Sequence, residues 1–595
     1  MNVWLKRVRL WCCFAVFVPG CQDSGIDISP KSTTGSLLAV NDDRRVTLVW
    51  TSWAGATPDE VDIFRGSHSG FSPDRSTYYA TVPGTVFRFE DEAVINGTAY
   101  YYRLVPVEQG EFGQRFSGSP ANEAYGRPFD YGAVTVPAYD QHIQPLFNSS
   151  CAVHGCHVGA DDATPDGLPL PRLAHGGQFS LKSWEDLFYG EKDGAVVVPF
   201  SSFKSDLVFH VNSDTMLAPV GLPHMPLPGL NLPASQVSTL IRWIDEGAKN
   251  QSGTFPFEVS PGGRVLSVCA SEDLIAVLDI ETGFLSRYVK VGREADPSLP
   301  FGSPHHVKVD PNGEFFYVTL INAQELWKFS AASYELLGRL PIPFQPADIA
   351  LTQTGDSAYV SSFNSSAGLV TLVNTSTMQI IRSITTPFAS NPHGVVLTND
   401  GTKVFVTNAG SGNLTMINRA DNSTSLVALD TLGNPFGSSV SPYLADVTPD
   451  DRFLFVTDYA PGGENVYVID LQVDPTKPSH VIPIGGRSVH VAVTPDGSSA
   501  FVCNLDLNSV HRIQIPEFTV STIPNVGKQP HGVAFSPDGT TAYVTTENTL
   551  TPDPPHHPST SGAGVSFVYV IDVATLRILR SVEVGAFGQG LTVIP

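Results

Sequence analysis

PHGVVLTNDGTKVFVTN (392–408) and PHGVAFSPDGTTAYVTT (530–546) are two copies of one pattern that recurs through the C-terminal part of the chain. In each copy, a strand-like stretch leads through an Asp-Gly turn into a second apolar stretch. Seven copies of the turn can be aligned, and five residues beyond each turn stands a valine followed by a small residue. The turn positions are Gly263, Gly313, Gly355, Gly401, Asp451, Gly497 and Gly539, and the small residues are Cys269, Thr319, Ser361, Thr407, Thr457, Cys503 and Thr545.

The intervals between successive turns lie between 42 and 50 residues. This period and the four strand-like stretches in each copy predict a seven-bladed β-propeller over residues 255–595. The first copy begins at its turn and lacks a first strand, whereas residues 588–593 match that strand at the other end of the chain. We therefore expect the last strand to complete the first blade and to close the ring, which leaves no free edge.

The SPDGxxAYVT pattern, best seen at 536–545, resembles the repeats of YVTN-type β-propellers, and the resemblance extends over all seven copies. It implies the fold and says little about function. Cys269 and Cys503 fall in blades that are not neighbours in a ring of seven. We therefore expect them to be small packed residues and not a disulfide.

A candidate site lies eight residues before the turns, where each copy begins its inner strand. Three imidazoles, a phenol and an amide would converge there on one mouth of the channel, as a site for a metal, a cofactor or a polar small molecule. Alternatively, each histidine only hydrogen-bonds the backbone of a neighbouring blade. His306 and His490 lie one place further on and are expected to face away from the axis. The candidate residues are His305, His393, Tyr443, His531 and Gln589.

The segment FNSSCAVHGCHVG (147–159) contains two cysteines and an adjacent histidine. Two thiols beside an imidazole suit the covalent capture of haem, although the spacing of four residues between Cys151 and Cys156 is longer than the usual two. A zinc half-site or a disulfide beside an unrelated histidine are alternatives. A zinc site would need further cysteine or histidine ligands at close spacing, and no second CxxC or HxxxH pair follows in this segment.

Three later stretches extend this pattern: VVPFSSFKSDL (197–207), PHMP (223–226) and the amphipathic LPASQVSTLIRWIDEGA (232–248). Together with the cysteines they resemble the c-type cytochrome domains of exported bacterial proteins. The resemblance implies a domain over 130–252 with one covalent haem c on Cys151 and Cys156. His157 and Met225 would be its axial ligands, and six-coordinate iron suits electron transfer. The alternatives to Met225 are Met216, His175, His210 and His224.

Residues 35–127 contain short runs of alternating apolar and polar residues, which predict half-buried strands. This segment resembles a fibronectin type III domain, a β-sandwich in which Trp50 would be the core tryptophan and Tyr100 the tyrosine-corner residue. Both roles are structural, so we expect this domain to act as a spacer or docking module.

The first 21 residues have the pattern of a secretory signal, with Lys6, Arg7 and Arg9 before a short apolar run at 10–18. The run ends in Val-Pro-Gly-Cys, which resembles the lipobox of bacterial lipoproteins with Cys21 as the lipidation site. We therefore expect an exported protein of the periplasm, outer membrane or cell surface, attached to the membrane only through a lipid anchor. Ordinary cleavage nearby is the alternative.

Composition limits the function further. The 595 residues carry a net charge of −23, which repels nucleic acid and anionic lipid. We expect a multidomain, mainly β protein built from a sandwich, a small α-helical cytochrome c-like domain and the propeller. The predicted function is haem c-dependent electron transfer to or from a periplasmic redox protein. The alternatives are an oxidoreductase whose active site lies in the propeller channel, and a surface binding protein with a redox-sensing haem.

Overall fold

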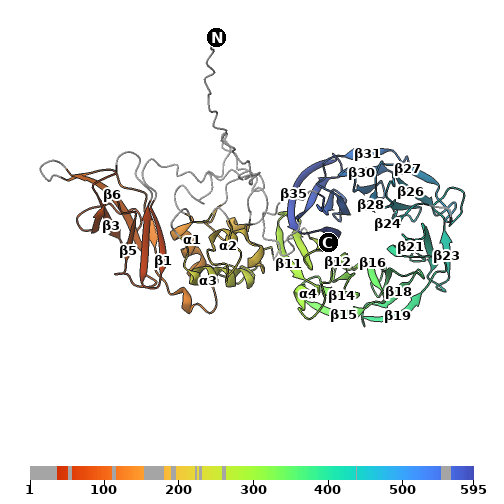
Figure 1. Cartoon of the computed structure of the whole chain (residues 1–595), viewed down its shortest axis with the longest axis horizontal. Helices are drawn as coiled ribbons and strands as arrows, with labels where there is room; N and C mark the ends of the chain where they lie inside the picture. Colours follow the sequence, from red (N-terminus) through yellow and green to blue (C-terminus); the bar gives the residue numbers. More distant parts are fainter. Residues whose placement is uncertain are drawn as a thin grey trace, which may run out of the picture.

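The computed structural model describes residues 37–50, 57–109, 115–152, 180–188, 196–221, 224–226, 231–257, 263–436, 439–550 and 564–595. It is mainly β, with a sandwich at one end, a small helical unit in the middle and a propeller at the other end (Figure 1). No helix in these ranges is long and apolar enough to cross a membrane.

The sandwich has two sheets that share one core, in which Trp50 and Tyr102 are buried. The hydroxyl of Tyr100 accepts a hydrogen bond from the backbone N–H of Ile95 at 3.0 Å, which fixes the chain as it enters its longest strand. One sheet contains β1 (Leu37–Asp42), β2 (Arg45–Trp50) and β5 (Arg88–Asp91), and the other contains β4 (Tyr78–Pro83), β3 (Glu60–Gly66), β6 (Tyr100–Gln109), β7 (Arg115–Ser117) and β8 (Ala124–Gly126).

The helical unit packs around a second core that includes Phe147, Phe188 and Trp243. Its longest helix lies where the amphipathic stretch at 232–248 predicts it, with Val237, Leu240 and Trp243 turned into this core. The elements are η1 (Tyr131–Ala133), η2 (Tyr139–Ile143), α1 (Gln144–Ser150), η4 (Glu185–Phe188), η5 (Ser202–Lys204), α2 (Asp206–Val211) and α3 (Ala234–Asp245).

Seven four-stranded sheets surround the channel of the propeller (Figure 1). The turn position predicted from the sequence has positive φ in all seven blades, between 55° at Asp451 and 83° at Gly263, as a tight turn of this kind requires. Blades 2 to 4 contain β12 (Pro304–Val309), β13 (Phe315–Leu320), β14 (Glu325–Ser330) and β15 (Leu336–Pro341); β16 (Gln345–Leu351), β17 (Ser357–Phe363), β18 (Val370–Asn374) and β19 (Gln379–Ile384); β20 (Pro392–Leu397), β21 (Lys403–Asn408), β22 (Asn413–Asn418) and β23 (Thr424–Val427).

Blades 5 to 7 follow in the same order, and blade 1 joins the two ends of the domain. The last strand, β36, pairs antiparallel with β9, so the sequence-based prediction of ring closure is confirmed. The elements are β24 (Pro442–Val447), β25 (Phe453–Asp458), β26 (Asn465–Asp470) and β27 (His480–Pro483); β28 (Ser488–Val493), β29 (Ser499–Asn504), β30 (Ser509–Gln514) and β31 (Val520–Ile523); β32 (Pro530–Phe535), β33 (Thr541–Thr546), β34 (Ser566–Asp572) and β35 (Arg577–Gly585); and, in blade 1, β36 (Gly588–Ile594), β9 (Arg264–Cys269), β10 (Leu274–Asp279), β11 (Leu285–Lys290) and the short α4 (Gly292–Ala295).

Every inner strand carries the same β-bulge near its start. In β12, for example, Pro304 pairs with Leu320 but Val307 pairs with Val318, so three steps on one strand match two on the other. The register shifts at the equivalent place in the other six blades. One extra residue is therefore inserted into each inner strand, which interrupts the simple alternation of its side chains.

A side-chain hydroxyl holds this bulge in five blades. In blade 4, Thr407 Oγ1 accepts the N–H of Gly394 at 2.7 Å and donates to the carbonyl of Tyr443, in the next blade, at 2.7 Å. Thr319, Ser361, Thr457 and Thr545 make the same two bonds. The small residue of the repeat is thus a hydrogen-bonded tie between blades. In the other two blades its place is taken by Cys269 and Cys503, which are buried free thiols, as their packing role predicts.

A buried ion pair connects the helical unit to the propeller. Lys204 Nζ lies 2.6 Å from Glu272 Oε1, and both side chains are almost completely buried. The second carboxylate oxygen of Glu272 accepts the N–H of Ala586, just before the closing strand. Val198 of the helical unit also packs into the core formed by blades 1 and 7. On the other side, Ser150 at the end of α1 donates to the carbonyl of Ala39 in β1.

We expect Thr407→Val to destabilise the propeller by about 1–3 kcal/mol, because the side chain keeps its shape but the N–H of Gly394 loses its acceptor. Thr407→Ser retains the hydroxyl and is the matched control. Urea unfolding of the three proteins measures the difference. Equal stability of the valine and serine variants would show that the hydroxyl tie contributes nothing.

Candidate functional site

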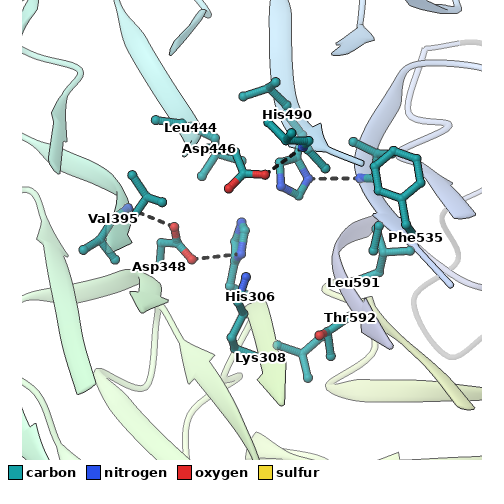
Figure 2. A pocket seen from close by; sticks show the side chains of 18 of the residues that line it. His306, Lys308, Asp348, Val395, Leu444, Asp446, His490, Phe535, Leu591 and Thr592 are labelled. Carbon is teal, nitrogen blue, oxygen red and sulfur yellow. Dashed lines mark hydrogen bonds and ion pairs between the residues drawn. The ribbon is translucent and has the colours of Figure 1, made fainter. Parts of the chain in front are cut away.

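The propeller channel contains a cavity of about 260 Å³, lined by inner-strand residues from all seven blades. Its polar lining consists mainly of His306, Lys308, Asp348, Asp446 and His490, among apolar side chains (Figure 2). Since these residues come from four different blades, the cavity exists only in the closed ring.

The candidate residues predicted at the start of the inner strands gather beside this cavity. The ring centroids of His305 and His393 are 5.0 Å apart, and His393 stacks on Tyr443 with a centroid distance of 3.7 Å. Tyr443 lies 6.2 Å from His531 by the same measure. Gln589 is also buried on its inner strand, and its Oε1 has no hydrogen-bond partner within the described residues.

His305 and His393 tie neighbouring strands together through their Nδ1 atoms. His305 Nδ1 lies 2.9 Å from the carbonyl of Ala347 and His393 Nδ1 lies 3.1 Å from that of Tyr443. A carbonyl only accepts, so both Nδ1 atoms carry the proton. Burial, with the adjacent His306, lowers the pKa of His305 to about 4, and burial also lowers that of His393. These contacts agree with the alternative that each histidine hydrogen-bonds the backbone of a neighbouring blade. A ligand role for the candidate residues stays a prediction.

His531 faces a buried carboxylate. Its Nε2 lies 3.7 Å from Glu547 Oε1, and both residues are largely buried. Burial raises the pKa of Glu547 to about 7 and lowers the pKa of His531. The pair therefore favours a protonated carboxyl beside a neutral imidazole in the folded protein.

The prediction that His306 and His490 face away from the axis is wrong. Both line the cavity, and their ring centroids are 5.9 Å apart although they belong to blades 2 and 6 (Figure 2). The bulge explains the error, because the extra residue lets two consecutive side chains of β12 reach the channel.

His306 is paired with a carboxylate. Its Nδ1 lies 3.0 Å from Asp348 Oδ1. The carboxylate also accepts the backbone N–H groups of Ile349 at 2.8 Å and Val395 at 2.9 Å. Burial acts to raise the pKa of Asp348, but the neighbouring His306 and the N–H of Val395 hold it below its usual value. Asp348 is therefore an anion that fixes the proton of His306 on Nδ1.

His490 has the opposite tautomer. Its Nδ1 accepts the backbone N–H of Val533 at 3.0 Å, so Nδ1 carries no proton and Nε2 is the donor. Burial, followed by the proximity of His306, lowers the pKa of His490 to about 3. The cavity thus holds one imidazole whose Nε2 can accept and one whose Nε2 donates.

The residues predicted to bind haem are described only in part. Cys151 is buried at the end of α1 and belongs to the core of the helical unit, and Met225 packs against the same core. Cys156, His157 and the alternative ligand His175 lie outside the described residues, as does the predicted lipidation site Cys21.

The remaining alternatives to Met225 differ in exposure. Met216 is 89% exposed, His224 is half-buried, and the carbonyl of His210 accepts the N–H of Met225. Within the ranges that the structure describes, no three histidine, cysteine, aspartate or glutamate side chains are placed to hold a metal ion.

Comparison with known proteins supports the propeller. The family model "Lactonase, 7-bladed beta-propeller" matches residues 358–551. No curated protein matches the chain. Among solved structures, hydrazine synthase of Kuenenia stuttgartiensis is 17% identical, with a TM-score of 0.40 over 49% of this chain and 89% of that one.

Two further solved structures are similar at the same level. Dihydro-heme d1 dehydrogenase NirN, in complex with DHE, is 12% identical, with a TM-score of 0.40 over 61% of this chain and 86% of that one. A protein described as a putative 6-phosphogluconolactonase, from Bacteroides uniformis, is 15% identical, with a TM-score of 0.43 over 56% of this chain and 99% of that one.

The buried carboxyl of Glu547 predicts a pH dependence of stability. Its ordinary pKa is 4.5 and its folded pKa about 7, so the folded state binds the extra proton between these values and loses stability as the pH rises through them. Glu547→Gln has no charge to bury. We expect its advantage in the free energy of unfolding over the wild type to grow across this window, to about 2–3 kcal/mol.

Denaturant unfolding at a series of pH values measures this difference, with Glu335→Gln at an exposed position as the control. A difference that stays constant with pH would contradict the burial-driven rise of the pKa of Glu547.

Proposed function

We propose that this protein is a haem c-binding electron-transfer protein of the cell envelope, with the propeller as the module that binds its partner or substrate. The observation that carries the proposal is that Cys151 and Met225, 74 positions apart in the sequence, border one apolar core. These residues belong to two separate stretches of the pattern that resembles a c-type cytochrome, at 147–159 and 223–226.

The residues present fit such a group. Cys151 ends α1, where its N–H bonds to the carbonyl of Phe147, and the surrounding core offers the aromatic and aliphatic side chains that a porphyrin face needs. Cys151 and Cys156 would hold the haem covalently, and His157 and Met225 would bind its iron. When bound, the haem supplies one-electron transfer. An apolar core around the haem would limit its contact with water and would favour the reduced, less charged form.

The neighbouring units would orient this domain toward its partner. The Lys204–Glu272 ion pair and Val198 attach it to blade 1, and Ser150 attaches it to the sandwich. We infer that the sandwich, which resembles a fibronectin type III domain, is a spacer between a lipid anchor on Cys21 and the haem domain. The partner would be a redox protein of the periplasm.

A second candidate function is that of a periplasmic oxidoreductase whose active site lies in the propeller channel. It is supported by the buried polar groups of five inner strands that meet around the axis. A triple variant of His305, His393 and His531 to alanine that keeps its haem spectrum separates the two functions. Loss of turnover would support the enzyme, and unchanged electron transfer would support the carrier.

The covalent attachment is tested by Cys151→Ser, Cys156→Ser in a host that matures c-type haem. We expect the double variant to lose haem staining on a denaturing gel, because both thioether bonds are gone. Cys269→Ser, at a buried cysteine of the propeller, is the matched control and should keep the stain. A double variant that remains stained would contradict the assignment.

The axial ligand is tested through the reduction potential. Since a thioether favours ferrous iron relative to a second imidazole, Met225→His should lower the potential and change the visible spectrum of the oxidised protein. Met216→His at the exposed alternative should leave both unchanged. The assignment fails if redox titration shows the shift in the Met216 variant instead, or in neither variant.

A further inference from the structure

We propose that the channel cavity binds a small hydroxy acid, with its hydroxyl group between His306 and His490 and its carboxylate at Lys308. This site is separate from the haem domain and does not depend on the presence of haem.

His306 has no role in closing the ring. Asp348 and His490, at the same position of other inner strands, each accept a backbone N–H from the next blade, those of Val395 and Val533. His306 instead contacts Asp348, whose oxygens already accept two backbone N–H groups. The strand edges are therefore satisfied without this imidazole.

His306 presents an unpaired ring nitrogen to the cavity. The residue is 6% exposed, and its Nε2 is buried with no hydrogen-bond partner within the described residues. In the imidazole tautomer that donates from Nδ1 to Asp348, Nε2 has a lone pair. A buried polar atom left unpaired is unfavourable, and a ligand that donates a hydrogen bond to it would remove this cost.

His490 supplies a hydrogen-bond donor beside this nitrogen. Its Nδ1 is occupied by the N–H of Val533, so its Nε2 carries the proton. Figure 2 shows the two imidazoles next to each other, and their centroids are 5.9 Å apart. A hydroxyl group both donates and accepts, so one hydroxyl oxygen can satisfy both nitrogens. A metal ion does not fit, because a protonated Nε2 cannot bind it.

Lys308 favours a ligand that carries an acidic group. It lines the same cavity two residues beyond His306. Within the described part of the chain it forms no salt bridge, and the nearby Asp446 uses its two oxygens for the N–H groups of Val447 and Val493. Its ammonium can therefore pair with a carboxylate of the ligand. The volume of about 260 Å³ and the apolar side chains of Leu444 and Leu591 limit the ligand to a small molecule.

The proposal is tested by isothermal titration calorimetry of the full-length protein with two matched pairs of probes: lactate against propionate, and malate against succinate. Each pair differs by one hydroxyl group. We expect a hydroxy acid to bind at least tenfold more tightly than its partner, because the analogue leaves both imidazoles unpaired. Equal affinity within both pairs, or no binding of either hydroxy acid at millimolar concentration, would overturn the proposal.

Variants locate the binding. His306→Ala and Lys308→Ala should each weaken binding of the hydroxy acid at least tenfold, whereas His480→Ala and Lys290→Ala, at exposed positions of outer strands, should not. If His306→Ala binds as tightly as the wild type, the proposal is wrong.

Should a channel variant fail to fold, nitrogen-15 imidazole NMR of the wild type gives a second test. Binding of the hydroxy acid must shift the Nε2 resonances of both His306 and His490. Resonances that stay in place when the acid is bound would contradict the site.

Discussion

In each of five blades, the hydrogen bonds of one serine or threonine side chain hold the inner strand of the propeller in place. A bulge interrupts the backbone hydrogen-bond ladder between two strands, and in five blades a serine or threonine hydroxyl on the neighbouring strand accepts the N–H of a residue in the bulge. The same hydroxyl donates to a carbonyl of the next blade. In each of these blades, one hydroxyl group therefore stabilises both the bulge and the contact with the next blade.

The bulge also gives the channel its chemistry, because consecutive side chains of one strand reach the axis. His305 and His306 show the result: the first bonds to a backbone carbonyl of the next blade, and the second pairs with Asp348 at the cavity. His305 thus connects two blades, while His306 keeps an Nε2 atom that has no hydrogen-bond partner within the described residues. Such division of roles within one strand is how a closed ring can be both stable and available to a ligand.

The repeat predicts the blades, the positive-φ turns and the closing strand, because each depends on local residue pattern and on the need to satisfy a sheet edge. It does not predict the direction of His306, since strict alternation assumes an unbroken strand. A signal was present in the glycine of the PHG pattern: a Cβ at Gly394 would lie 2.7 Å from the carbonyl of Tyr443. Glycine inside a strand marks such close approaches and bulges. In the helical unit, the sequence predicts α3 and its buried face. The histidine pair of the propeller cannot be predicted in this way, because His306 and His490 come from distant blades and leave no local pattern.

The function proposed for the chain rests on the helical unit between the sandwich and blade 1, which buried contacts hold on both sides. This function requires one haem attached through two thioether bonds near α1. It is tested by the mass of the intact protein, purified from a host that matures c-type haem, together with its visible spectrum. We expect a mass increase equal to one haem and a low-spin haem spectrum. A colourless protein with the mass of the polypeptide alone would contradict it.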